Sequence, residues 1–206
     1  MGGVAIAIGR RFARLATNVV VRWPFLWPVF RPLIRLQFDR LAGDWDAAMQ
    51  PDSTKPYEAA LERVQGSVRR ALDVGTGTGR GARAIAARFP DAEVVGVDVS
   101  PGMLAEARRV SPGLEFVEGD AAKLPFGDDE FDLVAHANMI PFLDETARVL
   151  RRGGWTVYAF SAGAETPIYV DPERLRRELE RRGFTDFSEI AAGRGIAVVA
   201  RRGGEV

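Results

Sequence analysis

Cysteine is absent from this 206-residue sequence, and histidine occurs only once, as His136. Without cysteine the chain can form neither a disulfide framework nor a thiolate metal site, and a reducing compartment is permitted. A single imidazole leaves no histidine cluster for zinc or iron. We therefore expect a cytoplasmic protein that binds no metal ion.

Long hydrophobic runs are missing as well. The longest uninterrupted apolar stretches fall far short of the roughly 18 residues that a membrane-spanning helix needs. A secretory signal fits poorly, because arginines interrupt the N-terminal apolar region and no convincing small-residue cleavage site follows. The sequence therefore predicts neither a spanning helix nor a cleaved leader.

Neither sign of charge dominates the whole chain, yet the charges are unevenly distributed. Lysine and arginine total 28, as do aspartate and glutamate. Residues 1–40 hold seven arginines and one aspartate, a net charge of +6, which leaves 21 basic and 27 acidic side chains, a net charge of −6, in the remainder. Phosphate contacts need clustered basic residues, so this acidic body argues against a nucleic acid partner.

A glycine-rich turn between two apolar runs is the strongest positive signal. Residues 71–74 are apolar enough for a buried parallel strand, and Gly75, Gly77 and Gly79 then lead into an alanine-rich helix. Glycine lets the backbone approach a ligand closely. Asp98 ends the next apolar run, where its carboxylate can accept hydrogen bonds from both ribose hydroxyls. The pattern predicts a site for an adenosine-bearing cofactor.

The spacing of these glycines distinguishes between cofactors. The dinucleotide fingerprint G-x-G-x-x-G requires glycine or alanine at position 80, which is Arg80, and a reading shifted to Gly77 begins too late after the strand. An acidic residue followed by G-x-G-x-G, as in Asp73 to Gly79, resembles the class I S-adenosylmethionine (SAM) dependent methyltransferases. The resemblance runs from about Arg69 to Arg202.

Four further segments carry the same resemblance. Residues 119–122 (G-D-A-A) follow a third apolar run, residues 124–126 (L-P-F) lead into a fourth, and residues 147–154 end in the double glycine that precedes the fifth. Residues 38–46 resemble the F-D-x-x-A-x-x-Y-D segment of many small-molecule methyltransferases, with Trp45 in place of tyrosine. The resemblance implies that Trp45 covers the methionine end of SAM; the alternative is an ordinary buried tryptophan.

The resemblance implies a site for SAM, and for its product S-adenosylhomocysteine, built from several segments. Asp73 and the glycine turn are expected at the methionine end, Asp98 at the ribose, Asp120 and Ala121 beside the adenine, and Met103 against the ring. The full set of expected cofactor residues is Asp73, Gly75, Thr76, Gly77, Gly79, Asp98, Val99, Met103, Asp120, Ala121, Ala135 and Trp45.

Methyl transfer from a sulfonium requires alignment in a dry pocket and no covalent residue. A general base is needed only where the acceptor must lose a proton. His136 leaves the predicted fourth strand beside this pocket, and its ordinary pKa near 6.5 suits that role. The alternatives are that it lines the cofactor site or simply ends a strand.

The predicted fold is α/β: a Rossmann-like, doubly wound, seven-stranded sheet with helices on both faces. Residues 192–195 are too short for a crossover, so the last strand must turn back antiparallel. We expect strands near 71–74, 93–98, 114–118, 131–136, 155–160, 184–190 and 196–201, and helices near 56–64, 80–88, 101–109, 142–151 and 171–182. Residues 67–206 form the expected methyltransferase domain, and residues 1–66 an N-terminal extension.

The start of the extension reads as an amphipathic helix. At about 100° per residue one arc carries Arg10, Arg11, Arg14, Asn18 and Arg22, and the opposite arc carries Ile8, Phe12, Leu15 and Val19. Residues 23–32 hold four aromatics, and their three prolines are expected to break regular helix. Three interpretations stay open: a lid on the body, an arm of a homodimer, or peripheral membrane contact through residues 1–35.

Together these observations predict a SAM-dependent methyltransferase of a small, lipophilic acceptor. The L-P-F segment and the F-D-x-x-A segment favour a quinone-like or lipid-like acceptor, as in the relatives that the resemblance suggests. Two alternatives remain: a regulatory module that binds SAM without turnover, and an NAD-dependent oxidoreductase.

Overall fold

The computed structural model describes residues 2–204, together with the side chains of residues 11–204 other than that of Pro51. Seven strands form one sheet in the order β3-β2-β1-β4-β5-β7-β6. Strands β1 to β5 pair in parallel, and β7 is antiparallel to both β5 and β6. This confirms the predicted Rossmann-like fold with its reversed last strand. The strands are β1 Arg70–Val74, β2 Glu93–Asp98, β3 Glu115–Glu118, β4 Phe131–Ala137, β5 Leu150–Phe160, β6 Phe184–Ala192 and β7 Gly195–Arg202.

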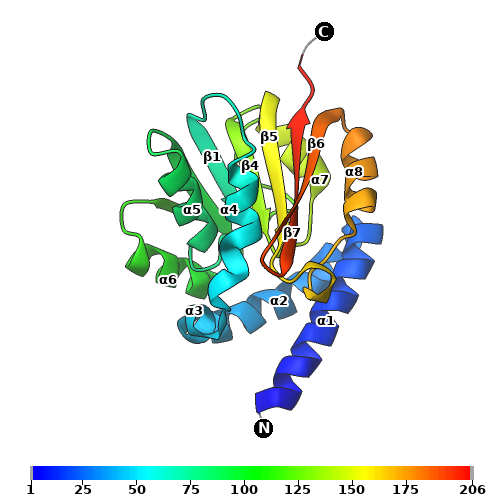
Figure 1. The fold of residues 1–206 in the computed structure, drawn as a ribbon. Helices are drawn as coiled ribbons and strands as arrows, with labels where there is room; N and C mark the ends of the chain where they lie inside the picture. The colour runs from blue at the N-terminus through cyan, green and yellow to red at the C-terminus, as the bar shows by residue number, and fades with distance from the viewer. Residues whose placement is uncertain (1, 205–206) are drawn as a thin grey trace.

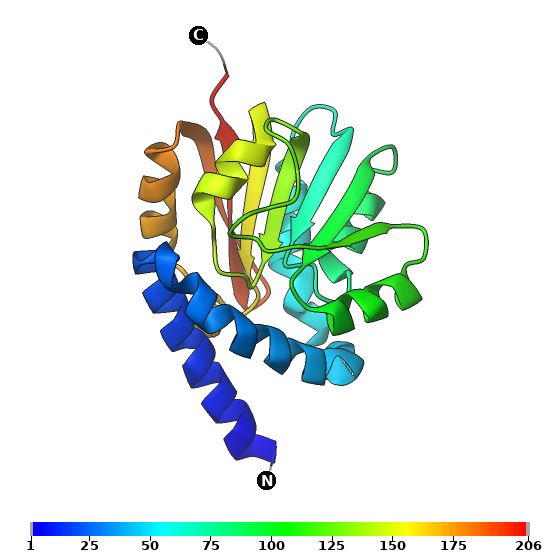
Figure 2. The ribbon, with the colours of Figure 1, turned by 180° about the vertical axis from the view of Figure 1, so that it is seen from behind.

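Helices cover both faces of the sheet, because its central strands are apolar on both sides. Leu72 of β1 pairs with Val95 of β2 and Val134 of β4, and all three are fully buried. Figures 1 and 2 show the two layers, one with α4 and α5 and the other with α7 and α8. The helices are α4 Lys55–Leu61, α5 Arg80–Arg88, α6 Pro101–Val110, α7 Leu143–Val149 and α8 Pro172–Glu180.

Helix α4 precedes residue 67 but lies within the core of the body. Tyr57, Ala60 and Leu61 are at most 2% exposed and pack with Ala71 of β1 and Ile85 of α5. The last residues of the predicted extension are therefore continuous with the sheet layer that follows them.

The remainder of the extension lies at the edge where the parallel strands end. Helix α2 runs across these carboxyl ends, and α1 projects away from the body (Figures 1 and 2). These segments are α1 Gly2–Arg22, η1 Pro24–Leu26, α2 Trp27–Leu41, η2 Ala42–Asp44, α3 Trp45–Ala48 and η3 Pro51–Thr54.

The expected effect of the three prolines was correct only at the first. Pro24 lies in the break between α1 and α2, whereas Pro28 and Pro32 lie inside α2. Pro28 occupies the first turn, where a backbone N–H has no helical partner in any case. Pro32 removes a single helical hydrogen bond, and the burial of neighbouring Trp27 against the body offsets that loss.

The predicted helix near 142–151 extends too far. Helix α7 ends at Val149, and Leu150 already pairs with Phe131 at the start of β5, ahead of a register shift toward Leu133. The backbone is crowded at this irregularity: a Cβ on Gly154 would lie 2.9 Å from the Asp132 carbonyl oxygen. The double glycine therefore lies inside a longer strand, not before it.

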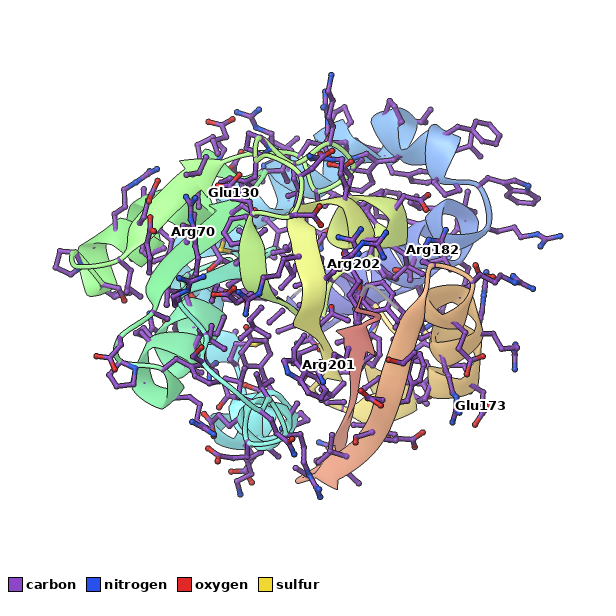
Figure 3. The ribbon with its side chains drawn as sticks, turned by 90° about the horizontal axis from the view of Figure 1, so that it is seen from above. Arg70, Glu130, Glu173, Arg182, Arg201 and Arg202 are labelled. Atoms are coloured by element: carbon purple, nitrogen blue, oxygen red, sulfur yellow. The ribbon has the colours of Figure 1, made fainter. Side chains whose placement is uncertain are left out.

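The opposite edge of the sheet carries ion pairs. Figure 3 looks onto it and shows Arg70, at the start of β1, close to Glu130. Their side chains form a 2.6 Å ion pair between Arg70 Nη1 and Glu130 Oε1. Arg202, at the end of β7, pairs with Asp129. Carboxylates thus neutralise both of these arginines.

Candidate cofactor site

The glycine turn between β1 and α5 has the backbone conformation that its residue types predict. Gly75, Gly77 and Gly79 have φ of +69°, +55° and +81°, in the left-handed region that favours glycine. The N–H groups of Gly75 and Thr76 donate to the Val97 carbonyl at 2.8 and 3.0 Å, which fixes the turn against β2. The turn is therefore held at the carboxyl ends of two neighbouring strands.

The space beside these glycines differs from one to the next. A Cβ on Gly75 would lie 2.8 Å from Met139 Sδ, and one on Gly79 would lie 2.9 Å from the Phe116 ring. A Cβ on Gly77 would meet nothing within 4 Å. Gly77 is thus the glycine at which a ligand can approach the backbone, while Gly79 is required by packing. This arrangement fits an adenosine-bearing cofactor.

Asp98 ends β2 beside this open position. Its Oδ2 accepts the Gly77 N–H at 2.9 Å, and its Oδ1 accepts the Ser100 N–H at 2.9 Å. Removal from water raises the pKa of this carboxyl. Each carboxylate oxygen has two lone pairs, so both retain capacity to accept a ribose hydroxyl. The structure therefore places Asp98 next to Gly77, as the predicted ribose site requires.

Asp73 lies beneath the glycine turn and is only 1% exposed. It accepts hydrogen bonds from Tyr57 Oη at 2.8 Å and from Thr76 Oγ1 at 2.7 Å. Burial raises its pKa to about 6. A Cβ on Gly81 would lie 2.5 Å from Asp73 Oδ1, so glycine lets the start of α5 sit on this carboxyl. The side chain thus shapes the turn from below, and its expected role at the methionine end of the cofactor stays a prediction.

Asp120, predicted to lie beside the adenine, is joined to the N-terminal extension. Trp27 Nε1 donates to its Oδ1 at 2.7 Å, and Arg31 Nη1 donates to its Oδ2 at 2.8 Å. The Ala122 N–H also donates to Oδ1, at 2.9 Å. Neither Trp27 nor Arg31 was predicted at this site, because they precede Asp120 by 93 and 89 residues.

Two carboxylates of the F-D-x-x-A segment fasten it to the site. Asp39 accepts from Ser100 Oγ at 2.6 Å and from the Gly102 N–H at 3.0 Å, and the bond from Ser100 lowers the pKa of Asp39. Asp46 accepts from Thr78 Oγ1 of the glycine turn at 2.6 Å. The resemblance of this segment to other methyltransferases implied no role for either acid.

Trp45 is half-buried, and its ring meets that of Phe38 edge to face at 5.3 Å. Because Asp46 binds the glycine turn, Trp45 lies on the segment that covers it. Val99 and Ala121 are half-buried beside the two site carboxylates. Met103 of α6 and Ala135 of β4 are at most 1% exposed, so both are core residues beneath the edge.

His136 is buried between β5 and α7. Its Nδ1 lies 3.1 Å from the Val157 carbonyl, its Nε2 lies 3.2 Å from Thr146 Oγ1, and its ring stacks on Tyr158 at 4.2 Å. Burial lowers its pKa to about 4. Both ring nitrogens have partners inside the protein, so this geometry argues against the predicted role as general base and favours the alternative of a strand-end residue.

A second feature that the sequence did not predict is an apolar cluster between α1, α2 and the loop after β4. Val20, Trp27, Ile140 and Phe142 are at most 9% exposed, and half-buried Met139 packs against them. Among the side chains that the structure describes, no group of histidine, aspartate and glutamate could hold a metal ion. The edge is thus lined by carboxylates on the β2–β3 side and by apolar groups on the β4 side.

Comparison with known proteins agrees with this geometry. Residues 71–154 match the family described as "Methyltransferase domain". This confirms the predicted resemblance to the class I SAM-dependent methyltransferases over the stretch from the glycine turn to the double glycine, and the sheet has the fold typical of that class.

Several characterised proteins are similar to this chain. It is 38% identical over 150 residues to trans-aconitate 2-methyltransferase of Methylobacterium nodulans, and this alignment covers 66% of this chain and 57% of that protein. It is 38% identical over 112 residues to a phthiotriol/phenolphthiotriol dimycocerosates methyltransferase of Mycobacterium leprae (50% and 42%). It is 41% identical over 140 residues to demethylmenaquinone methyltransferase of Chlorobaculum parvum (60% and 58%). The chain thus spans about half the length of these relatives.

Solved structures show the same fold. A methyltransferase in complex with a methyltransferase activator from Haloferax volcanii aligns with a TM-score of 0.69 at 22% identity, over 81% of this chain and 97% of that one. Phosphoethanolamine N-methyltransferase 2 of Haemonchus contortus, in complex with SAM, aligns with a TM-score of 0.65 at 17% identity, over 80% and 57%.

Proposed function

We propose that this protein transfers the methyl group of SAM to a small, lipophilic acceptor of the quinone or lipid kind. The observation that carries the proposal is the pairing of Gly77 with Asp98. The glycine backbone is open to a ligand, and its N–H binds a carboxylate that retains acceptor capacity. A nucleoside with free ribose hydroxyls fits this pair.

Bound SAM would supply an electrophilic methyl group on its sulfonium sulfur. The residues of the chain would then bind and orient it: Asp98 at the ribose, Gly77 along the backbone, and Asp120 beside the adenine. Asp73 would keep the turn in shape from beneath. Because a neutral thioether leaves, the protein needs chiefly to align the reactants and to exclude water.

The apolar cluster supports a lipophilic acceptor. Trp27, Ile140 and Phe142 lie at the carboxyl end of the sheet, next to Met139, which packs on Gly75 of the turn. An acceptor that reaches the methyl group from the β4 side would therefore contact hydrocarbon and aromatic rings. The names of two relatives, demethylmenaquinone methyltransferase and phthiotriol/phenolphthiotriol dimycocerosates methyltransferase, support the same class.

The test incubates the protein with methyl-labelled SAM and three acceptor sets: a total lipid extract, a demethylated quinone, and trans-aconitate as a polar acceptor. Mass spectrometry then identifies any labelled product. Wild type should label a component of the first or second set. Asp98→Ala should not, whereas Asp91→Ala, at an exposed aspartate, should behave as wild type.

Two outcomes would overturn the proposal. Binding of SAM without labelling of any acceptor would favour a regulatory module. Thermal stabilisation by NAD, with none by SAM or S-adenosylhomocysteine, would favour an oxidoreductase. Labelling of trans-aconitate alone would retain methyl transfer but contradict the lipophilic acceptor.

A further inference from the structure

Helix α2 has two apolar faces, and only one of them is covered. Trp27 is 6% exposed, and Phe30 and Ile34 are half-buried in the same cluster against the body. The opposite face carries Val29 and Leu33, which are 67% and 56% exposed. An apolar stripe on the solvent side of a helix has no role in folding the helix onto its own body.

The stripe continues along α2, and further exposed apolar side chains lie in the segments before the helix. Leu36, about one turn after Leu33, is 46% exposed. Before the helix, Phe25 is 76% exposed, Trp23 is 49% exposed and Leu15 is 58% exposed. We call these six side chains the α1–α2 face. Among the residues with described side chains, Leu41 and Val110 are the other large exposed hydrophobic residues. Such a concentration in one region marks an interaction surface.

Within the segment that carries the α1–α2 face, the charged side chains are all of one sign. Residues 1–38 contain arginine but no aspartate or glutamate. Arg31 and Arg35 keep nearly half of their side chains exposed while pairing with Asp120 and Glu118 of the body. An apolar segment that carries tryptophan and arginine, and no acidic residue of its own, complements anionic headgroups above an acyl layer.

We propose that the α1–α2 face docks this protein on the surface of an anionic lipid bilayer. Phe25, Val29 and Leu33 enter the boundary between headgroups and acyl chains, and neighbouring arginines bind the headgroups. Among residues 2–204, no helix is long and apolar enough to cross a membrane. The contact is therefore one in which the helix lies along the surface.

The position of α2 links this surface to the site. The buried side of the helix holds Asp120 through Trp27, and the helix runs across the carboxyl ends of the strands (Figure 2). Docking therefore brings the bilayer next to the apolar cluster on the β4 side. A lipophilic acceptor could enter from the bilayer without crossing water; this last step rests on the proposed function, whereas the docking itself does not.

Flotation of the full-length protein tests the docking. One vesicle set is phosphatidylcholine alone, and a second adds phosphatidylglycerol; neither SAM nor acceptor is present. Wild type should float with the anionic vesicles. The double variant Val29→Ser with Leu33→Ser should lose roughly tenfold or more in partitioning, because two exposed apolar side chains no longer insert. Val110→Ser, which removes an exposed valine on α6, should float as wild type.

The remaining outcomes decide against the proposal. If wild type floats with neither vesicle set, or if the double variant floats equally well, membrane docking is wrong. If light scattering shows a wild-type dimer that the double variant splits, and neither floats, the face is a dimer interface. Circular dichroism and binding of S-adenosylhomocysteine should be unchanged in all variants. Flotation without methyl transfer would overturn only the proposed function, and transfer without flotation only the docking.

Discussion

The indole nitrogen of Trp27 donates a 2.7 Å hydrogen bond to Asp120 Oδ1, which joins α2 to the loop after β3. Asp120 is also the residue that the methyltransferase resemblance places beside the adenine. One carboxylate therefore serves two neighbours, the N-terminal extension on one side and the expected cofactor on the other. A change in the strength of either contact should therefore change the strength of the other, because binding free energies that depend on the same group are linked.

Replacing Trp27 by phenylalanine should loosen α1 and α2 without unfolding the body. The change removes the donor to Asp120 and keeps a ring that can pack on Phe142, which the indole now meets at 5.2 Å. A partly buried bond to a carboxylate contributes about 1.5 to 3 kcal/mol. Trypsin should therefore cut after Arg35, within α2, several-fold faster, as followed by mass spectrometry.

The matched control for that substitution is Trp23→Phe. Trp23 lies four residues earlier, is 49% exposed, and forms no side-chain hydrogen bond within the described part of the chain. It should leave the cleavage rate unchanged. Equal rates of trypsin cleavage in wild type and both variants would show that the bond to Asp120 does not hold the extension in place.

Substitution of Gly77 by alanine separates cofactor binding from folding. A Cβ at Gly77 meets no protein atom within 4 Å, so the cost to folding is the left-handed backbone alone, about 1 kcal/mol. Gly66, in the loop before β1, has the same two properties, with φ of +83°. Both variants should lose similar stability in urea.

Only the variant at Gly77 should lose affinity for S-adenosylhomocysteine, because its new methyl group fills the space in which the cofactor lies against the protein backbone. Calorimetry should show at least a tenfold weakening for Gly77→Ala and none for Gly66→Ala. Equal affinities in the two variants would move the cofactor away from the glycine turn.

What the sequence predicted well is local. The glycine turn, the apolar strands and Asp98 at the end of β2 lie within about 30 residues of one another, and their backbone conformations follow from residue type. The contact of Trp27 with Asp120 is different, because it depends on how a whole helix docks. Nothing near either residue in the sequence signals it.

His136 shows a second limit. Successive side chains of a strand point to opposite faces, so His136 shares the face of Val134, against α7 and α8. In a strand that is apolar on both sides, this alternation carries no polar signal from which the face could be chosen. The position of His136 at the end of β4 was correctly predicted, whereas the sequence left open whether its side chain faces the pocket or the interior.

The raised pKa of Asp73 predicts a specific pH dependence of stability. The pKa is about 6 in the folded protein and near 3.8 when unfolded. Between these values the folded state keeps a proton that the unfolded state has lost, so the free energy of unfolding falls as pH rises through this window. The fall amounts to about 3 kcal/mol and is complete above pH 6 or so.

Comparison with Asp73→Asn isolates this effect from the other titrating groups. Tyr57 and Thr76 donate to different oxygens of Asp73, so asparagine can accept only one of these two bonds; it does not ionise, and the lost bond lowers its stability equally at every pH in this range. The difference in unfolding free energy between wild type and variant, measured in urea from pH 4 to 7.5, should change by about 3 kcal/mol in the stated direction. A difference that stays flat across this range would contradict the burial of Asp73 as an ionisable group.

His136→Phe should lower stability at most modestly at pH 7 and leave methyl transfer nearly intact. Phenylalanine keeps a ring against Tyr158 and loses the contacts with Val157 and Thr146. Because the pKa of His136 is lowered to about 4, the unfolded state takes up its proton first as pH falls below 6.5. The unfolding free energy of wild type should therefore fall by about 3 kcal/mol from pH 6.5 to 4 relative to that of the variant.

The activity of His136→Phe tests the role of general base. Such a base contributes roughly a hundredfold or more to the rate, whereas we expect a change of about threefold in kcat and no ionisation near pH 6.5 in the rate profile. A hundredfold fall in kcat, with unchanged SAM affinity and stability, would restore His136 as the catalytic base.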